Sequence, residues 1–375
     1  MRGYKRFAVV TVLSALMVLT AKFEPAQAQT KVGSSVSNLG NFSDPKSFGM
    51  GGCLVTNVNA RSAYQSPGTL GLFHLDKVLS VAIPIKLSNW PGTRYDSYTK
   101  VYGGSLGAST STFGLLKSSR LRLAFGVSYF YRKFDSGSYW GTTYENSGLG
   151  QSYGYTLTNE TYTISAAIEY YVRFSAGYSY HDVMYSWRGT ESSGSDLQLY
   201  DNHDLSLVLE VPVASLLNRE IQSEDGFNRT GNWEVTPATA YYYNHEAETG
   251  AFGFSLFVAQ NRALARLGSV RLAFEKHYPS GFDSRGQDKA GGELGLLDIV
   301  FVRIGTYNSS VFTYGFGFSL HGVIMWLMET GRLNDRMLSK YPLLGRFDIS
   351  FDYATHDAAV VSDDRPALLG IDISF

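Results

Sequence analysis

The chain has 375 residues, of which 44% are hydrophobic, 14% aromatic and only 17% charged, and its formal net charge is -1. This composition excludes a disordered chain, which is poor in aromatic residues and rich in net charge. The balanced charge argues against a nucleic-acid partner, because nucleic-acid-binding proteins carry a basic excess. The single cysteine excludes an internal disulfide and a multi-cysteine zinc or iron–sulfur site.

The first 28 residues have the three parts of a secretory signal peptide. Basic residues precede the apolar run 7–21, which is too short to span a bilayer comfortably. Small residues follow at Ala26 and Ala28, at the spacing of a cleavage site. We therefore expect 1–28 to be removed near Ala28, the alternative being an uncleaved membrane anchor. After Ala28 no run approaches the ~18 apolar residues that a transmembrane helix needs.

Downstream, hydrophobic residues recur with a period of two. In the segment 120–133 one face of an extended strand is apolar, and the other is small or charged. Two architectures produce this alternation. A soluble sandwich or barrel turns the apolar face inward, whereas an outer-membrane barrel turns it outward to lipid.

Three features favour the membrane barrel. The alternating segments run about 10 to 15 residues, which exceeds the ~5–6 residues of typical soluble strands. The other face is rich in Gly, Ser and Ala, which suit a crowded interior. Tyrosines cluster toward segment ends, as in the aromatic girdles at membrane interfaces.

The pattern predicts an all-β fold: a transmembrane antiparallel β-barrel of about 14 strands, within a range of 12 to 16, formed by 77–375. The expected strands are 77–86, 98–109, 119–133, 152–171, 173–187, 196–211, 233–243, 250–260, 267–277, 292–297, 299–307, 311–321, 345–354 and 366–375. The expected loops are 134–151, 188–195, 218–232 and 278–292. One or two helical turns are expected at 213–220, and either a short helix or an irregular loop at 325–338.

The C-terminal segment alternates to the last residue. Leu369, Ile371, Ile373 and Phe375 share one face. A last strand ending in Phe resembles the terminal recognition strand of bacterial outer-membrane barrels. That resemblance implies the barrel-assembly machinery as a partner.

Residues 29–76 lack the barrel pattern and are expected to form a plug in the lumen or a cap at one end. The run Gly49-Met50-Gly51-Gly52 is followed by 59–73, which predicts a short helix that ends near Pro67 and Gly68. Proline cannot continue a helix that precedes it, and it pushes the residue before it to extended geometry.

These residues carry a family resemblance. The runs 46–53 and 57–70 resemble the N-terminus of the PorV/PorQ-like family, within the FadL-like superfamily of outer-membrane barrels. The resemblance continues in 296–307, 314–318 and 347–354 and is poor in the middle of the chain. Ser66 stands where the family usually has Asn before Pro, and Asn57 and Asn59 replace its acidic residues.

No catalytic, cofactor or metal site is expected. Histidine precedes aspartate three times, at 181–182, 203–204 and 356–357, but adjacent strand residues face opposite sides. We expect these pairs in solvent or loops. Several charges are expected in the barrel interior, either in ion pairs or tuning the lumen. They are Arg120, Arg122, Arg132, Arg303, Arg346, Glu169, Asp348 and Asp352.

The resemblance implies a non-enzymatic protein of the bacterial outer membrane, in contact with its lipid. PorV-like members are accessory barrels of type IX protein secretion, so secretion components would be partners. The alternative is a FadL-like channel for hydrophobic small molecules. Such a solute would pass the plug near Phe48, Met50 and Leu54. A hydrolase would need a Ser–His–acid geometry that the sequence does not display.

Overall fold

The computed structural model describes thirteen stretches of the chain, and the predicted signal peptide lies outside them. The described residues are 44–84, 98–110, 121–135, 139–141, 151–188, 197–213, 233–243, 247–259, 266–279, 287–307, 311–333, 347–357 and 367–375.

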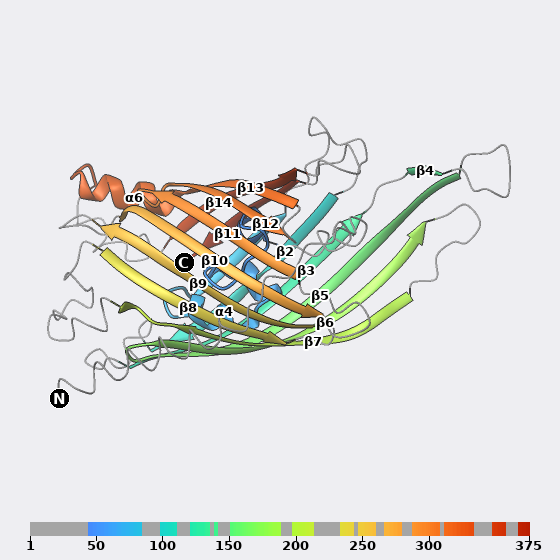
Figure 1. The fold of residues 1–375 in the computed structure, drawn as a ribbon, viewed down its shortest axis with the longest axis horizontal. Coiled ribbons are helices and arrows are strands. Elements are labelled where there is room, and N and C mark those ends of the chain that lie inside the picture. Colours follow the sequence, from blue (N-terminus) through green and yellow to red (C-terminus); the bar gives the residue numbers. More distant parts are fainter. Residues whose placement is uncertain are drawn as a thin grey trace.

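Within these residues, antiparallel strands form a closed barrel (Figure 1). The strands are β1 (Leu79–Pro84), β2 (Tyr98–Ser109), β3 (Arg122–Asp135), β4 (Tyr139–Gly141), β5 (Gln151–Glu169), β6 (Arg173–Arg188), β7 (Leu197–Glu210), β8 (Trp233–Tyr243), β9 (Ala247–Ala259), β10 (Arg266–Pro279), β11 (Gln287–Leu296), β12 (Val300–Tyr307), β13 (Val311–Ser319), β14 (Asp348–Asp357) and β15 (Ala367–Ser374). The ring closes because β3 pairs with β5 and β1 pairs with β15, while the short β4 pairs with β5 outside the ring. Fourteen of the described strands therefore make the wall, which confirms the predicted fold.

Each of the fourteen predicted segments overlaps one of these strands, most ends differ by a few residues, and three differences are larger or of another kind. The predicted loop 278–292 is wrong in its last part, because β11 begins at Gln287 and pairs with β10 from there. The predicted loop 134–151 contains β4. The predicted strand 311–321 ends at Ser319, whose side chain caps the helix α6 (Leu320–Glu329) by accepting from the Gly322 N–H.

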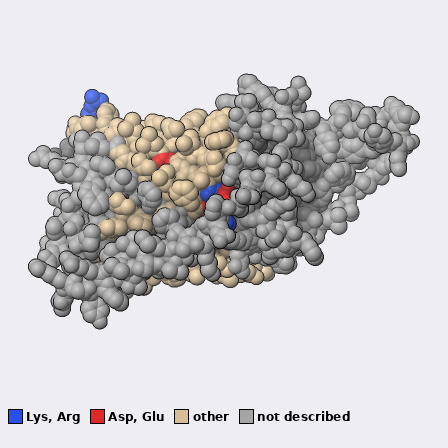
Figure 2. Space-filling view, viewed as in Figure 1, with Lys and Arg blue, Asp and Glu red and all other residues tan. Residues whose placement is uncertain are grey.

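The apolar face of the strands points outward. On β3, Leu123, Phe125 and Val127 are exposed, while Ala124 and Phe130 on the opposite face are buried. Figure 2 shows much of the described outer surface free of charged side chains. Such a continuous apolar surface is unfavourable in water and matches lipid, so the barrel is transmembrane. Among the described residues, no helix is both long and apolar enough to cross a membrane.

Tyrosines mark a border of the apolar band. The band runs from Tyr162 on β5 to Tyr170, directly after the end of β5, which is roughly 26 Å of extended chain. Beyond Tyr162 the next outward residue is Glu160, which accepts a hydrogen bond from the Tyr162 hydroxyl at 2.9 Å. Tyr162 lies beside Tyr129 and Tyr180 on the neighbouring strands, with ring centroids 5.1 and 6.4 Å away. This row agrees with the predicted aromatic girdle.

The N-terminal segment fills the lumen (Figure 1). It contains α3 (Pro45–Gly49), the 3-10 helix η1 (Arg61–Tyr64) and α4 (Pro67–His74), and we call 44–78 the plug. Helix α3 contacts β12 to β15, while α4 contacts β2, β3, β5, β6 and β7. The predicted helix 59–73 is wrong as one element, because Pro67 begins α4 instead of ending a helix. Proline fits there because the first helical residue needs no N–H partner.

Candidate functional site: the plug and the charged wall

The Met-Gly-Gly turn of the plug lies directly on glycines of the wall. A Cβ at Gly291 would lie 2.1 Å from the Met50 carbonyl oxygen, and one at Gly305 would lie 2.2 Å from the Gly51 nitrogen. Gly51 has a φ of +70°, which side chains rarely adopt, and its N–H donates to Thr313 Oγ1 at 2.9 Å. Any side chain at these positions would lift the plug off the wall.

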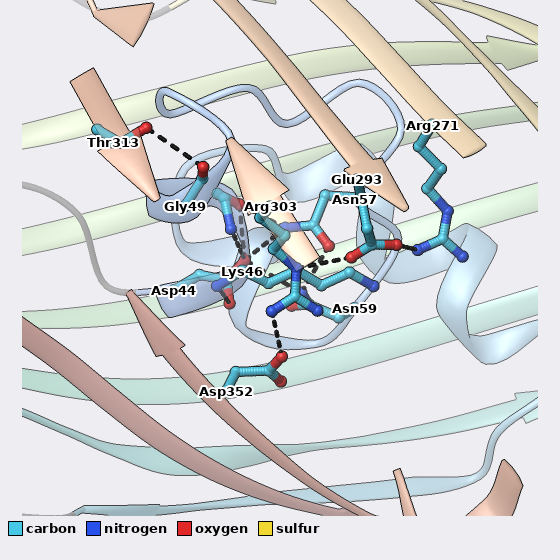
Figure 3. A network of polar contacts seen from close by, with 11 residues as sticks. Asp44, Lys46, Gly49, Asn57, Asn59, Arg271, Glu293, Arg303, Thr313 and Asp352 are labelled. Carbon is cyan, nitrogen blue, oxygen red and sulfur yellow. Dashed lines mark hydrogen bonds and ion pairs between the residues drawn. The ribbon is translucent and has the colours of Figure 1, made fainter. Parts of the chain in front are cut away.

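A second set of contacts folds the plug on itself around Asp44. This carboxylate accepts from Ser47 N at 3.0 Å, Asn57 Nδ2 at 2.5 Å and Asn59 Nδ2 at 3.1 Å (Figure 3). Both asparagines belong to the plug. Their amide groups are donors, whereas carboxylates at the same positions would repel Asp44.

A charged ladder crosses the wall beneath α3 (Figure 3). Glu293 is paired with Arg271 and with Arg303, whose Nε lies 2.6 Å from its Oε2. Arg303 Nη1 then reaches Asp352 Oδ1 at 2.6 Å. Arg303 stands on β12 and Asp352 on β14, so the guanidinium must pass over β13. It does so at Gly317, where a Cβ would lie 2.7 Å from Arg303 Nη2.

The plug residue Lys46 lies near this ladder (Figure 3). Burial, and next the neighbouring Arg271, lower the pKa of Lys46 below its ordinary value. Glu293 and Asp352 act in the opposite direction.

A second chain of charges lies on the opposite wall, where β3 and β6 begin and β5 and β7 end. Arg122 bonds Glu169 at 2.9 Å and the plug residue Asp76 at 2.5 Å. Arg173 bonds Glu169 at 3.3 Å and Glu210 at 3.4 Å. Alternating signs let each charge face a partner; Glu210 is buried, and Asp76 at the other end of the chain of charges is exposed.

The interior charges singled out in the sequence fall into three groups. Arg122, Glu169, Arg303 and Asp352 belong to the two chains of ion pairs. Arg132 lies over the ring of the plug residue Tyr64, with 5.4 Å between the guanidinium carbon and the centroid. Asp348 instead accepts from Ser319 Oγ and His321 N at the start of α6. Arg120 and Arg346 lie outside the described residues.

Helix α4 lies on a surface of small residues. Ser206 Oγ accepts from Gly68 N at 2.5 Å, and Ser165 Oγ accepts from Gly71 N at 3.0 Å. A Cβ at Gly177 would lie 2.3 Å from Pro67. The Gly and Ser face of these strands therefore brings the helix backbone into direct contact with the wall.

Glu275 on β10 anchors the plug on a third side. Its carboxylate accepts from the backbone N–H groups of Leu54 and Val55, the latter at 2.8 Å. The sequence had not pointed to Glu275. Phe48, Met50 and Leu54, the residues expected to contact a solute, are at most 4% exposed.

His181 has partners that the sequence analysis missed. Its Nε2 lies 3.0 Å from Asp204 Oδ2 on β7, and its Nδ1 lies 2.8 Å from Thr161 Oγ1 on β5. The expectation of a solvent or loop position is therefore wrong for His181 and for Asp204, whose side chain is 13% exposed. Thr161 is fully buried, and Tyr64 lies edge-on to His181 with 5.4 Å between centroids. A substrate therefore has no access to the Thr161 hydroxyl.

The other two histidine–aspartate pairs differ from the first. His203 is exposed on the outer face, where its Nδ1 lies 2.5 Å from the Tyr178 hydroxyl. The side chains of 356–357 lie outside the described residues. No group of three or more described His, Cys, Asp or Glu side chains could hold a metal ion.

The C-terminal strand takes its place beside the first. Ile371 and Ile373 are opposite Ile83 and Val81, and the Phe375 N–H donates to the Leu79 carbonyl at 3.0 Å. The Phe375 ring lies 5.2 Å from that of Phe347, centroid to centroid. Leu369 pairs with Tyr353 on β14.

Comparison with known proteins gives little beyond this geometry. No protein-family model and no curated protein matches the chain. Among solved structures, the chain is similar to the beta domain of the Bordetella autotransporter BrkA. The TM-score is 0.30 and the identity 11%, over 79% of this chain and 95% of that one.

Proposed function

We propose that this chain is a non-enzymatic outer-membrane barrel that acts as an accessory component of protein secretion, of the PorV type. The observation that carries the proposal is the plug, which bonds opposite walls of the lumen through Gly51, Arg61, Gly68 and Asp76. A diffusion porin needs a water-filled lumen. A barrel that acts by holding a partner does not.

The outer face and two sequence features support a location in the outer membrane. The predicted signal peptide would export the protein, and the exposed apolar band would contact outer-membrane lipid. The strand that ends at Phe375 would be read by the barrel-assembly machinery.

The long strands β5 and β6 support a partner-binding role. β5 has 19 residues, of which the stretch from Tyr162 onward covers the apolar band. The remainder, with β4, projects past the other strands at one end of the barrel (Figure 1). This projecting sheet offers backbone and side chains to an exported protein or a secretion component.

The test is a deletion strain assayed for two activities. Without the gene, we expect exported proteins to remain in the periplasm while uptake of labelled long-chain fatty acid stays normal. The intact gene restores export. A variant in which a short Gly–Ser linker replaces 136–150, and so removes β4, should not restore it. Normal export in the deletion strain would refute the proposal.

One observation favours a second function, uptake of a hydrophobic solute. The plug residues Met50, Leu54 and Val55 belong to an apolar cluster with Ala240 and Ala273 of the wall. An apolar solute could replace these contacts if the plug moved. Loss of fatty-acid uptake with normal export would favour this function.

A further inference from the structure

The strand that closes the barrel, β1, lies between β15 and β2. β1 has six residues, the fewest in the closed ring of described strands. It is paired through five residues with β15, from Ser80 with Ser374 to Pro84 with Gly370. It is paired through four residues with β2. Pro84, its last residue, has no N–H to donate. Among the described residues, this β1–β15 junction, the seam, also includes the bond from the Phe375 N–H to the Leu79 carbonyl at 3.0 Å.

One side chain of the plug bonds both strands of the seam. Arg61 Nη2 donates to the Ile371 carbonyl of β15 at 2.8 Å and to the Ile83 carbonyl of β1 at 3.4 Å. Ile83 and Ile371 are directly opposite each other in the ladder. The Nε of the same guanidinium lies 2.6 Å from Asp372 Oδ1. The planar fork of arginine suits this three-way contact, because its donors are held in fixed directions.

The wall is shaped to receive this guanidinium. A Cβ at Gly370 would lie 2.8 Å from Arg61 Nη1, so only glycine leaves room. The Arg61 side chain is 3% exposed. Its bonds are therefore made away from water, where breaking one partner of a charged pair is costly.

Arg61 is also fixed to the body of the plug. The Ser62 N–H next to it donates to Asn59 Oδ1 at 2.7 Å, and Asn59 in turn donates to Asp44. Any movement of the plug out of the lumen would therefore withdraw the guanidinium from both strands.

We propose that the plug is a clasp on the barrel seam. It holds β1 against β15 through Arg61, so displacement of the plug and loosening of the seam are one transition. The plug then determines whether β1 and β15 stay paired as well as whether the lumen is filled.

The test compares Arg61→Met with Arg122→Met in a Cys53→Ala background. Arg122 also links the plug to the wall, through Asp76, but on β3. Arg61→Met should accelerate hydrogen exchange in β1 and β15 by at least about tenfold and leave β8 and β9 unchanged. Arg122→Met should leave the seam unchanged. Equal acceleration in all strands, or none, would overturn the proposal.

Two engineered disulfides separate a clasp from a general loss of stability. Val81→Cys with Ile373→Cys crosses the seam, and Val127→Cys with Ile164→Cys crosses the β3–β5 pair; both join directly opposite residues. The seam disulfide should restore slow exchange to Arg61→Met, and the other should not. If Arg61→Met fails to fold, rescue by the seam disulfide alone supports the clasp. Rescue by both or by neither contradicts it.

Discussion

Replacing Gly305 by alanine should unseat the plug. The new Cβ would lie 2.2 Å from the Gly51 nitrogen, whereas ordinary contact begins at 3.4 Å, so wall and turn must separate by roughly 1.2 Å. That movement breaks the 2.9 Å hydrogen bond from Gly51 N to Thr313. Overpacking costs about 1–3 kcal/mol and the lost bond about 1 kcal/mol. We expect the free energy of unfolding to fall by roughly 2–4 kcal/mol.

The measurement is urea unfolding of the protein in detergent micelles, followed by tryptophan fluorescence and by the heat-modifiable shift on gels. Gly268→Ala is the matched control, because the nearest atom to its Cβ is a carbonyl oxygen 3.7 Å away. It should be neutral or slightly stabilising, since alanine orders a strand at lower entropic cost than glycine. If Gly305→Ala unfolds at the same urea concentration as Gly268→Ala, the plug is not seated on Gly305.

Three further predictions concern the ladder, a turn and pH. Arg303→Met leaves Glu293 and Asp352 without a shared partner and should cost about 3–5 kcal/mol in urea unfolding; a loss under 1 kcal/mol would contradict the ladder. Leu297 has a φ of +56°, which is strained for a side-chain-bearing residue. Leu297→Gly should therefore raise the free energy of unfolding by about 1 kcal/mol. A fall would show that contacts of the leucine side chain outweigh the backbone strain. Burial lowers the pKa of His74 below 6.5, so the unfolded chain binds the extra proton and stability falls with pH below about 6.5. His74→Gln should flatten that slope between pH 7 and 5, and an unchanged slope would exclude His74 as its source.

The strands could be predicted because lipid demands an apolar residue at every second position. On β13 this rule separates exposed Phe312, Tyr314 and Phe316 from the inward face. The same rule failed at the start of β11, where 287–292 has no alternation. There the strand exists because it is paired with β10 from His277 and Gln287 onward. Hydrogen bonds between the backbones of two strands do not depend on side-chain hydrophobicity, so the sequence pattern does not reveal them.

The plug was recognisable as an exception to the pattern, but its contacts were not. The Met-Gly-Gly turn needs Gly291 and Gly305, which lie more than 200 residues away in the chain. His181 finds Asp204 across β6 and β7, whose register shifts between Val183 and Met184. Counting residues outward from the connecting loop would therefore have placed the aspartate on the wrong face.

The unequal strand lengths make the mouth of the barrel oblique. β5 has 19 residues and β13 has 9, a difference of roughly 33 Å along the strand direction. A large protein that arrives at this end meets a tall wall on one side and a low rim on the other. Under the proposed function, this outline would set the orientation of a bound protein before any side chain makes a specific contact.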